Sequence, residues 1–143
     1  MITPLRPASS AAGVSLGATS AMDPETSHRI AADVAFDCVG VSGSADRAIS
    51  LTRKGGRIVL VGIFNDPPVT ELNKLVLGER EMVGSFAYVN DFPRAIELVA
   101  EGRIPIDTFV SRQITLREAI ERGFDDLVAE PGNYVRILIK PQP

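Results

Sequence analysis

Histidine and cysteine, the side chains that most often bind zinc in proteins, are almost missing from this sequence. Its 143 residues include one histidine, His28, and one cysteine, Cys38. A zinc site takes three or four ligands, so these two residues cannot form one by themselves. We expect His28 to lie in an exposed loop and Cys38 to pack as a small buried residue at a strand end. A single thiol excludes an intrachain disulfide and favours a reducing compartment, the cytoplasm.

An excess of positive charge and a long apolar run are also missing. The net charge is −3, which argues against nucleic-acid binding, because such proteins normally carry a basic face, and against attachment to an anionic membrane. No apolar stretch approaches the roughly 20 residues of a membrane span. The first 20 residues lack the continuous apolar run of a signal peptide. We therefore expect a soluble, cytoplasmic protein with no nucleic-acid or membrane partner.

Two apolar runs with a helical pattern between them form the clearest part of the chain. Residues 33–39 are mostly apolar, which is typical of a buried strand in a parallel sheet. Residues 45–52 repeat apolar side chains at helical spacing, and the glycine pair at 55–56 predicts the helix end. Residues 57–64 form a second, β-branched strand. A strand, a helix and a strand with short links predict a βαβ unit, and hence an α/β fold with a doubly wound parallel sheet.

The flanking segments carry shorter patterns. The start of the chain is rich in proline, serine and alanine and lacks clear periodicity, which fits either a weak helix over 9–17 or a frayed start. Residues 19–23 fit a short strand. Further along, residues 72–77 predict a short helix or an edge segment, and residues 81–88 a third strand. Asp91 is predicted to cap the next helix. We expect its apolar face to be buried, and that face consists of Ala95, Ile96, Leu98 and Val99.

The C-terminal part predicts a strand, a helix and a strand. Residues 109–114 alternate in polarity as a strand does. Thr115 and Glu118 match the capping box, in which the two side chains satisfy amides at the start of a helix. We therefore expect a helix over 115–128 and a final strand over 134–140.

Several segments, in this order, resemble the nucleotide-binding domain of the medium-chain, zinc-type alcohol and polyol dehydrogenases, with the butanediol and sorbitol branch the most similar. They are residues 32–40 (ADVAFDCVG), 53–62 (RKGGRIVLVG), 84–88 (GSFAY), 101–104 (EGRI) and 116–120 (LREAI). The resemblance extends over residues 16–141. It implies the second half of a Rossmann-like sheet at 16–106 and a C-terminal return to the catalytic-domain region at 107–143, while the composition of residues 1–15 predicts an irregular N-terminal segment.

The resemblance implies NAD(P) as the cofactor. In this family a zinc ion polarises the alcohol oxygen, and a hydride passes to the nicotinamide. The zinc ligands belong to an N-terminal catalytic domain, and none of them is in this chain. The sequence also lacks the loop G-x-G-x-x-G, which holds the pyrophosphate at a helix N-terminus. We therefore expect no catalytic residue and no zinc in this chain, although it resembles an alcohol dehydrogenase.

The resemblance also implies which residues line the cofactor. Most of them follow the strands of a parallel sheet, where such sheets bind ligands. The ten residues are Cys38, Val39, Gly40, Val61, Gly62, Ile63, Ser85, Phe86, Ala87 and Arg136. In the family, the positions of residues 38–40 pass near the adenosine, those of 61–63 line the nicotinamide, and those of 85–87 offer backbone groups to its carboxamide. The position of Arg136 meets the pyrophosphate in some members.

Packing is the alternative role for several of these residues. Val61, Ile63 and Phe86 fit a hydrophobic core as well as they fit a cofactor wall. Arg136 lies inside a predicted strand and fits an outward, solvated position equally well. The two roles differ in exposure, because core side chains are buried.

Three functional hypotheses remain open. The chain is a fragment of an NAD(P)-dependent alcohol or polyol oxidoreductase and inactive alone, or it is half of a split dehydrogenase completed by a separately encoded N-terminal half. The third hypothesis is a non-enzymatic module that dimerises or binds through the sheet edge near residues 69–88. A sheet that lacks strands exposes apolar surface, at a cost of ~25 cal/mol per Å², and this favours a partner.

Overall fold

The computed structural model describes residues 13–14, 16–22, 30–130 and 132–141. The chain divides into two compact units, with the boundary between Tyr88 and Val89. Most of the weak helix predicted over 9–17 and the loop position of His28 lie outside the described residues. Residues 19–22 form no strand, so the described part of that prediction is wrong.

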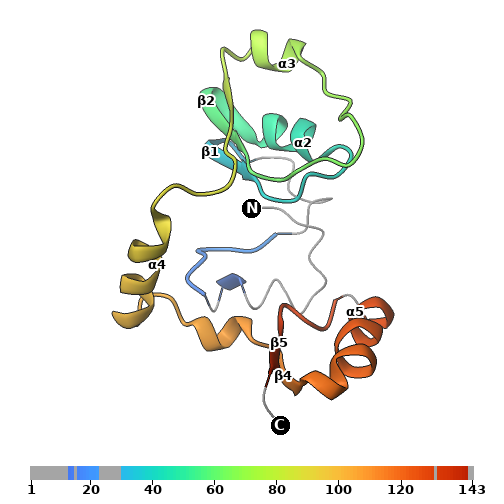
Figure 1. Ribbon diagram of the computed structural model, residues 1–143. Coiled ribbons are helices and arrows are strands. Elements are labelled where there is room, and N and C mark those ends of the chain that lie inside the picture. The colour runs from blue at the N-terminus through green and yellow to red at the C-terminus, as the bar shows by residue number, and fades with distance from the viewer. Residues whose placement is uncertain (1–12, 15, 23–29, 131, 142–143) are drawn as a thin grey trace. The chain divides into compact units, whose positions relative to one another are not determined.

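The first unit contains a parallel three-stranded sheet (Figure 1). The elements follow one another as β1 (Ala32–Asp37), α2 (Ser44–Leu51), β2 (Thr52–Leu60), α3 (Asn73–Val76) and β3 (Glu81–Gly84). The strand order is β1-β2-β3, and both neighbouring pairs are parallel. The predicted α/β class and the βαβ unit are therefore confirmed. Of the two alternatives for residues 72–77, the short helix is the one present, as α3.

The ends of the strands differ from the prediction. β2 begins at Thr52, so the glycine pair at 55–56 lies within the strand rather than after a helix end. The pairing with β1 is irregular there: Ala32 pairs with Thr52, but Val34 pairs with Arg57. All three strands also end earlier than predicted, at Asp37, Leu60 and Gly84. The reason at β2 is that the next two amides, of residues 61 and 62, both donate to the main-chain oxygen of Asp37.

One face of this sheet carries the core of the unit. Ile49 of α2 and Ile58 of β2 are both fully buried. They form a cluster with Ala48, and four partly buried residues pack against it, namely Ala35, Leu60, Leu75 and Met82. Side chains alternate between the faces of a strand, so the residues next to these in sequence point to the other face.

The other face of the sheet is apolar and exposed. Phe36, Val59 and Val83 lie in one row across the three strands. Phe36 is 51% exposed and Val83 is 41% exposed. A strand of a doubly wound sheet is normally covered on both faces. The prediction of a buried strand over 33–39 is therefore wrong for this face, because no described element packs on it closely enough to bury Phe36.

The second unit pairs two short parallel strands. Its elements are α4 (Asp91–Ala100), a 3₁₀ turn (Ile106–Phe109), β4 (Arg112–Thr115), a second 3₁₀ turn (Leu116–Glu118), a π-helix (Ala119–Asp125), α5 (Asp126–Ala129) and β5 (Ile137–Lys140). β4 and β5 pair from Arg112 with Ile137 to Thr115 with Lys140. The predicted order of strand, helical segment and strand is confirmed, but the two strands begin at Arg112 and Ile137 rather than at residues 109 and 134.

Two predictions for this unit are wrong in detail. On α4, Ala95 and Ile96 are exposed, and Leu98 and Val99 are only half-buried. The predicted buried face therefore has no full cover in the described residues. The helix expected over 115–128 is not a continuous α-helix, because its middle has the wider π geometry. Ala119 and Gly123, four residues apart, are both buried there, and a Cβ on Gly123 would lie 3.2 Å from Cδ1 of Ile114 on β4.

The predicted capping box is present at the start of this helical segment. Glu118 Oε2 accepts hydrogen bonds from the Thr115 amide and the Thr115 hydroxyl, both at 2.9 Å. Arg122 donates to the other carboxylate oxygen of Glu118. The hydrogen bond from the Thr115 backbone amide and the guanidinium of Arg122 lower the pKa of Glu118 from 4.5 to about 2. The ionised carboxylate is therefore the form that stabilises this helix end.

This lowered pKa predicts a loss of the helix start in acid. The folded pKa of Glu118 lies below its ordinary value, so its stabilising contribution is complete above pH ~4.5 and is lost as the pH falls toward about 2. An NMR titration of the side-chain carboxyl signal should give a midpoint well below 4. In Glu118→Gln, the amide signal of Thr115 should lose this acid transition. A midpoint at the ordinary glutamate value would contradict the capping geometry.

Candidate functional site

Two backbone turns cross at the carboxyl end of the three-stranded sheet. One follows β1 and contains Gly40, which has a φ of 71°. The other follows β2 and contains Gly62. A Cβ on Gly40 would lie 2.6 Å from the main-chain oxygen of Ile63, and a Cβ on Gly62 would lie 2.3 Å from the nitrogen of Gly40. Neither turn has room for a side chain at the crossing, so glycine is required at both positions.

The carboxylate of Asp37 holds the first turn. Its Oδ1 accepts the amide hydrogens of Val39 at 3.0 Å and Gly40 at 3.2 Å. Its Oδ2 accepts the hydroxyl of Ser44 at 2.6 Å. The side chain of Asp37 thus joins the end of β1 to the start of α2. The sequence reasoning did not select Asp37 or Ser44. The available signal was an acidic residue inside an apolar run, seven residues before a serine at a helix start.

A third turn follows β3 and lies next in the same row. The amide of Ser85 donates to the main-chain oxygen of Leu60 at 2.8 Å, which places the turn beside the end of β2. Ala87 has a φ of 56°, an uncommon value for a residue other than glycine. The three turns contain nine of the ten residues predicted to line the cofactor. These nine are Cys38, Val39, Gly40, Val61, Gly62, Ile63, Ser85, Phe86 and Ala87.

Three large apolar side chains of these turns are exposed, whereas Val39 is half-buried. Val61 is 44% exposed, Ile63 70% and Phe86 83%. The packing alternative for these three residues is therefore wrong. Cys38 is also exposed, which corrects its expected burial. The reason is that Cys38 comes directly after the last paired residue of β1, where the chain leaves the sheet. The rim formed by these four residues has no ionic side chain of its own, and it offers apolar surface to a ligand.

Arg136 belongs to the second unit. It is exposed and lies just before β5 rather than inside a strand, and its main-chain oxygen accepts the amide hydrogen of Ser111 at 2.9 Å. This corrects its expected position within a strand. Its predicted contact with a pyrophosphate stays a prediction.

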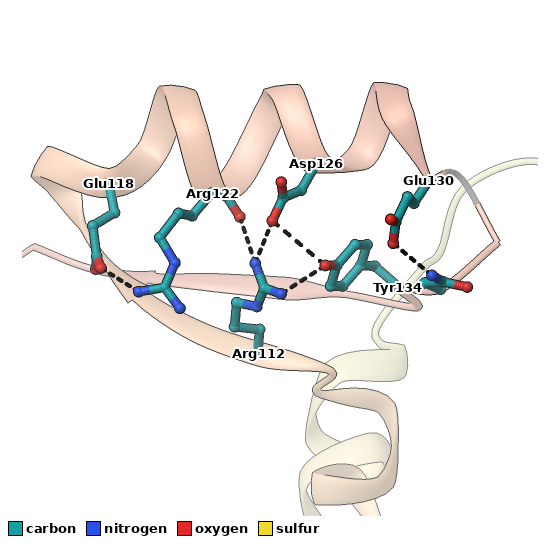
Figure 2. A network of polar contacts seen from close by, with 7 residues as sticks. Arg112, Glu118, Arg122, Asp126, Glu130 and Tyr134 are labelled. Carbon is teal, nitrogen blue, oxygen red and sulfur yellow. Dashed lines mark hydrogen bonds and ion pairs between the residues drawn. The ribbon is translucent and has the colours of Figure 1, made fainter.

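A polar cluster around Arg112 holds the second unit together (Figure 2). The guanidinium of Arg112 forms an ion pair with Asp126, donates to the Tyr134 hydroxyl at 2.6 Å and lies 4.7 Å from the centre of the Tyr134 ring. The bond to Asp126 raises the pKa of Arg112 above its ordinary value. These contacts tie β4 to α5 and to the segment that leads into β5. Sequence reasoning missed the cluster, because its members lie 14 and 22 residues from Arg112.

Zinc does not fit the residues that the structure describes. Among them, no three histidine, cysteine, aspartate or glutamate side chains come together as a metal site would need.

The described helices include none that is long and apolar enough to cross a membrane.

Comparison with known proteins gives consistent results at the level of sequence. Residues 7–101 match the family model described as zinc-binding dehydrogenase. The (R,R)-butanediol dehydrogenase of Neisseria gonorrhoeae is 30% identical over 109 residues, which are 76% of this chain and 31% of that protein. The sorbitol dehydrogenase of Gallus gallus is 32% identical over 111 residues, or 78% of this chain and 30% of the relative. The chain thus spans about a third of the length of these relatives.

Solved structures give the same picture. The 2R,3R-butanediol dehydrogenase of Bacillus subtilis matches with a TM-score of 0.85 and 30% identity, over 96% of this chain and 42% of that one. A zinc-binding dehydrogenase from Sinorhizobium meliloti, solved with bound NADP, matches with a TM-score of 0.81 and 28% identity, over 97% of this chain and 44% of that one.

Proposed function

Because this chain belongs to the zinc-binding dehydrogenase family, we propose that it forms the nicotinamide-side part of the nucleotide-binding domain of an NAD(P)-dependent alcohol or polyol oxidoreductase. The observation that carries the proposal is the exposed apolar rim at the carboxyl end of the sheet, where Val61, Ile63 and Phe86 are uncovered. Parallel sheets bind ligands at this end. A flat ring fits such an apolar rim better than a phosphate does, because none of these three side chains carries a positive charge.

The residues of the rim have distinct roles in this proposal. Val61 and Ile63 form an apolar wall against one face of the nicotinamide and exclude water from it. The backbone groups of residues 85–87 hydrogen-bond the carboxamide and set the orientation of the ring. Bound NAD(P) supplies the hydride acceptor in this family. The sequence lacks the G-x-G-x-x-G loop, and the described residues contain no group that could hold zinc. We therefore propose that the chain binds the cofactor weakly and oxidises no alcohol alone.

A titration with NADH tests the proposed site. We expect NADH to shift the amide NMR signals of Gly62, Ile63 and Ser85 with millimolar affinity. Ile63→Asp should abolish these shifts, because it places a charge against the ring. Val128→Asp is the matched control: Ile63 is 70% exposed and Val128 is 82% exposed, so neither change should disturb folding. Unchanged signals in the unaltered chain at 10 mM NADH, an amount about tenfold above a millimolar dissociation constant, would contradict the proposal.

The activity assay addresses the second part of the proposal. The purified chain should reduce neither NAD nor NADP with 2,3-butanediol or sorbitol, with or without added zinc. These substrates are chosen because the similar proteins are butanediol and sorbitol dehydrogenases. Turnover by the chain alone would contradict the proposed inactivity.

A split dehydrogenase is a second candidate, and the open side of the sheet favours it. β1 is an end strand of the described sheet, and Val34 and Phe36 on it are 46% and 51% exposed. A separately encoded half could add strands to this edge and cover this face. Co-expression with a polypeptide that carries the glycine-rich loop and the zinc ligands should then restore alcohol oxidation. No complex and no activity would count against this candidate.

A dimerisation module is the third candidate. β3 is the other end strand of the described sheet, and the segment before it exposes Leu72, Val76 and Leu77. An edge strand with apolar surroundings needs cover, and a second copy of the chain could supply it. Sedimentation of the purified chain used for the NADH titration measures its oligomeric state and distinguishes the candidates. A stable dimer without NADH binding favours a non-enzymatic module, whereas a monomer contradicts one.

A further inference from the structure

Asp37 is a buried carboxylate that the proposed cofactor contacts do not use. It is 5% exposed. Burying a carboxylate is costly unless hydrogen bonds compensate for the lost water. Here the amides of Val39 and Gly40 and the hydroxyl of Ser44 donate to it. Its main-chain oxygen accepts the amide hydrogens of Val61 and Gly62, each at 2.8 Å. This one residue is therefore bonded to both of the turns that cross at the end of the sheet.

Where the two turns cross, a movement of one toward the other displaces both, because their backbones are in contact. The backbone of Gly62 lies directly against the backbone of Val39 and Gly40, with no side chain between them. A displacement of the first turn therefore cannot be absorbed by a change of rotamer, and it must move Gly62 and the exposed Ile63 beside it. The hydrogen bonds to the Asp37 carboxylate hold the first turn in place, and through the crossing they constrain Ile63, the neighbour of Gly62 in the apolar rim.

We propose that Asp37, supported by Ser44, is a positioning residue for the cofactor: it touches no ligand but fixes residues 38–40 against residues 61–63. This inference rests on the proposed function. By the family resemblance, residues 38–40 pass near the adenosine and residues 61–63 line the nicotinamide, so one cofactor contacts both turns. Its affinity falls when the two turns must be ordered during binding. Asp37 orders them in advance. Ser44 contributes because its hydroxyl holds Oδ2, while Oδ1 is left to the two amides.

Four variants test this role through the affinity of the folded protein for NADH, measured from the amide signals. Asp37→Ala should weaken binding about tenfold, because the amides of Val39 and Gly40 then lose the carboxylate that orders them before binding. Asp37→Asn should recover most of the loss, since its amide oxygen still accepts the Val39 and Gly40 amide hydrogens. Ser44→Ala should weaken binding by about threefold. Asp33→Asn is the control, because the Asp33 side chain lies on the same strand but is 81% exposed.

Urea unfolding of the same variants separates positioning from simple stabilisation. A structural role alone would lower the unfolding midpoint of Asp37→Ala and leave the affinity of its folded molecules unchanged, and this result would overturn the positioning role. If Asp37→Ala does not fold, Ser44→Ala decides by the same comparison, and an affinity equal to that of the unaltered chain overturns the role. No binding by the unaltered chain would instead overturn the proposed function, and this inference with it.

Discussion

Replacing Gly62 with alanine should lower the free energy of unfolding of the first unit by about 3 kcal/mol. The new Cβ would lie 2.3 Å from the nitrogen of Gly40, 2.6 Å from the carbonyl carbon of Val39 and 2.8 Å from the Cα of Gly40. All three are backbone atoms, so no change of rotamer can relieve the contact. The two turns must separate, and the bonds from their amides to Asp37 must lengthen or break.

Gly84 provides the matched control for this substitution. It ends β3, and a Cβ built on it meets no heavy atom within 4 Å. Gly84→Ala should therefore leave the stability unchanged or raise it slightly, because alanine reduces the freedom of the unfolded chain. Urea unfolding followed by circular dichroism measures both variants. Equal midpoints for Gly62→Ala and Gly84→Ala would mean that the turns do not cross at backbone contact.

Ile49→Ala should cost the first unit about 3 kcal/mol, for a different reason. Ile49 is fully buried on α2 and packs in the cluster that contains Ile58. The substitution removes buried methyl and methylene groups and leaves a cavity. The neighbours of Ile49 are held by the sheet and by α2 itself, so we expect them to fill this cavity only in part.

The matched control for the core substitution is Ile96→Ala. Ile96 is also an isoleucine on a helix, but it is 66% exposed, so the change should alter stability by less than about 0.5 kcal/mol. Thermal unfolding of the two variants gives the comparison. A large loss at Ile96 would show that the apolar face of α4 is covered in solution, as its sequence pattern predicts.

The parts of the fold that depend on local patterns could be predicted from the sequence. The βαβ unit follows from two apolar runs that flank a helical repeat, and the capping box follows from the spacing of Thr115 and Glu118. The pattern failed at residues 55–56, because a glycine pair fits a helix end and an irregular strand start equally well. Here the amide of Gly55 donates a hydrogen bond to the main-chain oxygen of Gly78, 23 residues later in the chain. A pattern of neighbouring residues cannot predict such a distant contact.

The positions of the three turns could be predicted from the sequence, but the contacts that hold them could not, and their binding of a cofactor stays a prediction. The resemblance located the three turns, yet the role of Asp37 depends on bonds to two separate turns, and the cluster at Arg112 depends on partners far along the chain. Burial was the least predictable property. An amphipathic pattern, such as that of α4, shows which face would be covered, but it does not show whether the covering element is part of the same chain.

The exposure of Cys38 gives this molecule one reactive thiol for site-specific labelling. It is the one cysteine of the sequence, its side chain is open to solvent, and it stands two residues before the glycine at the crossing. A thiol-reactive fluorophore will therefore attach at one place and report on the rim itself, with no engineering of the chain. The same thiol can link two copies of the protein in air, so a reductant belongs in every experiment that measures association.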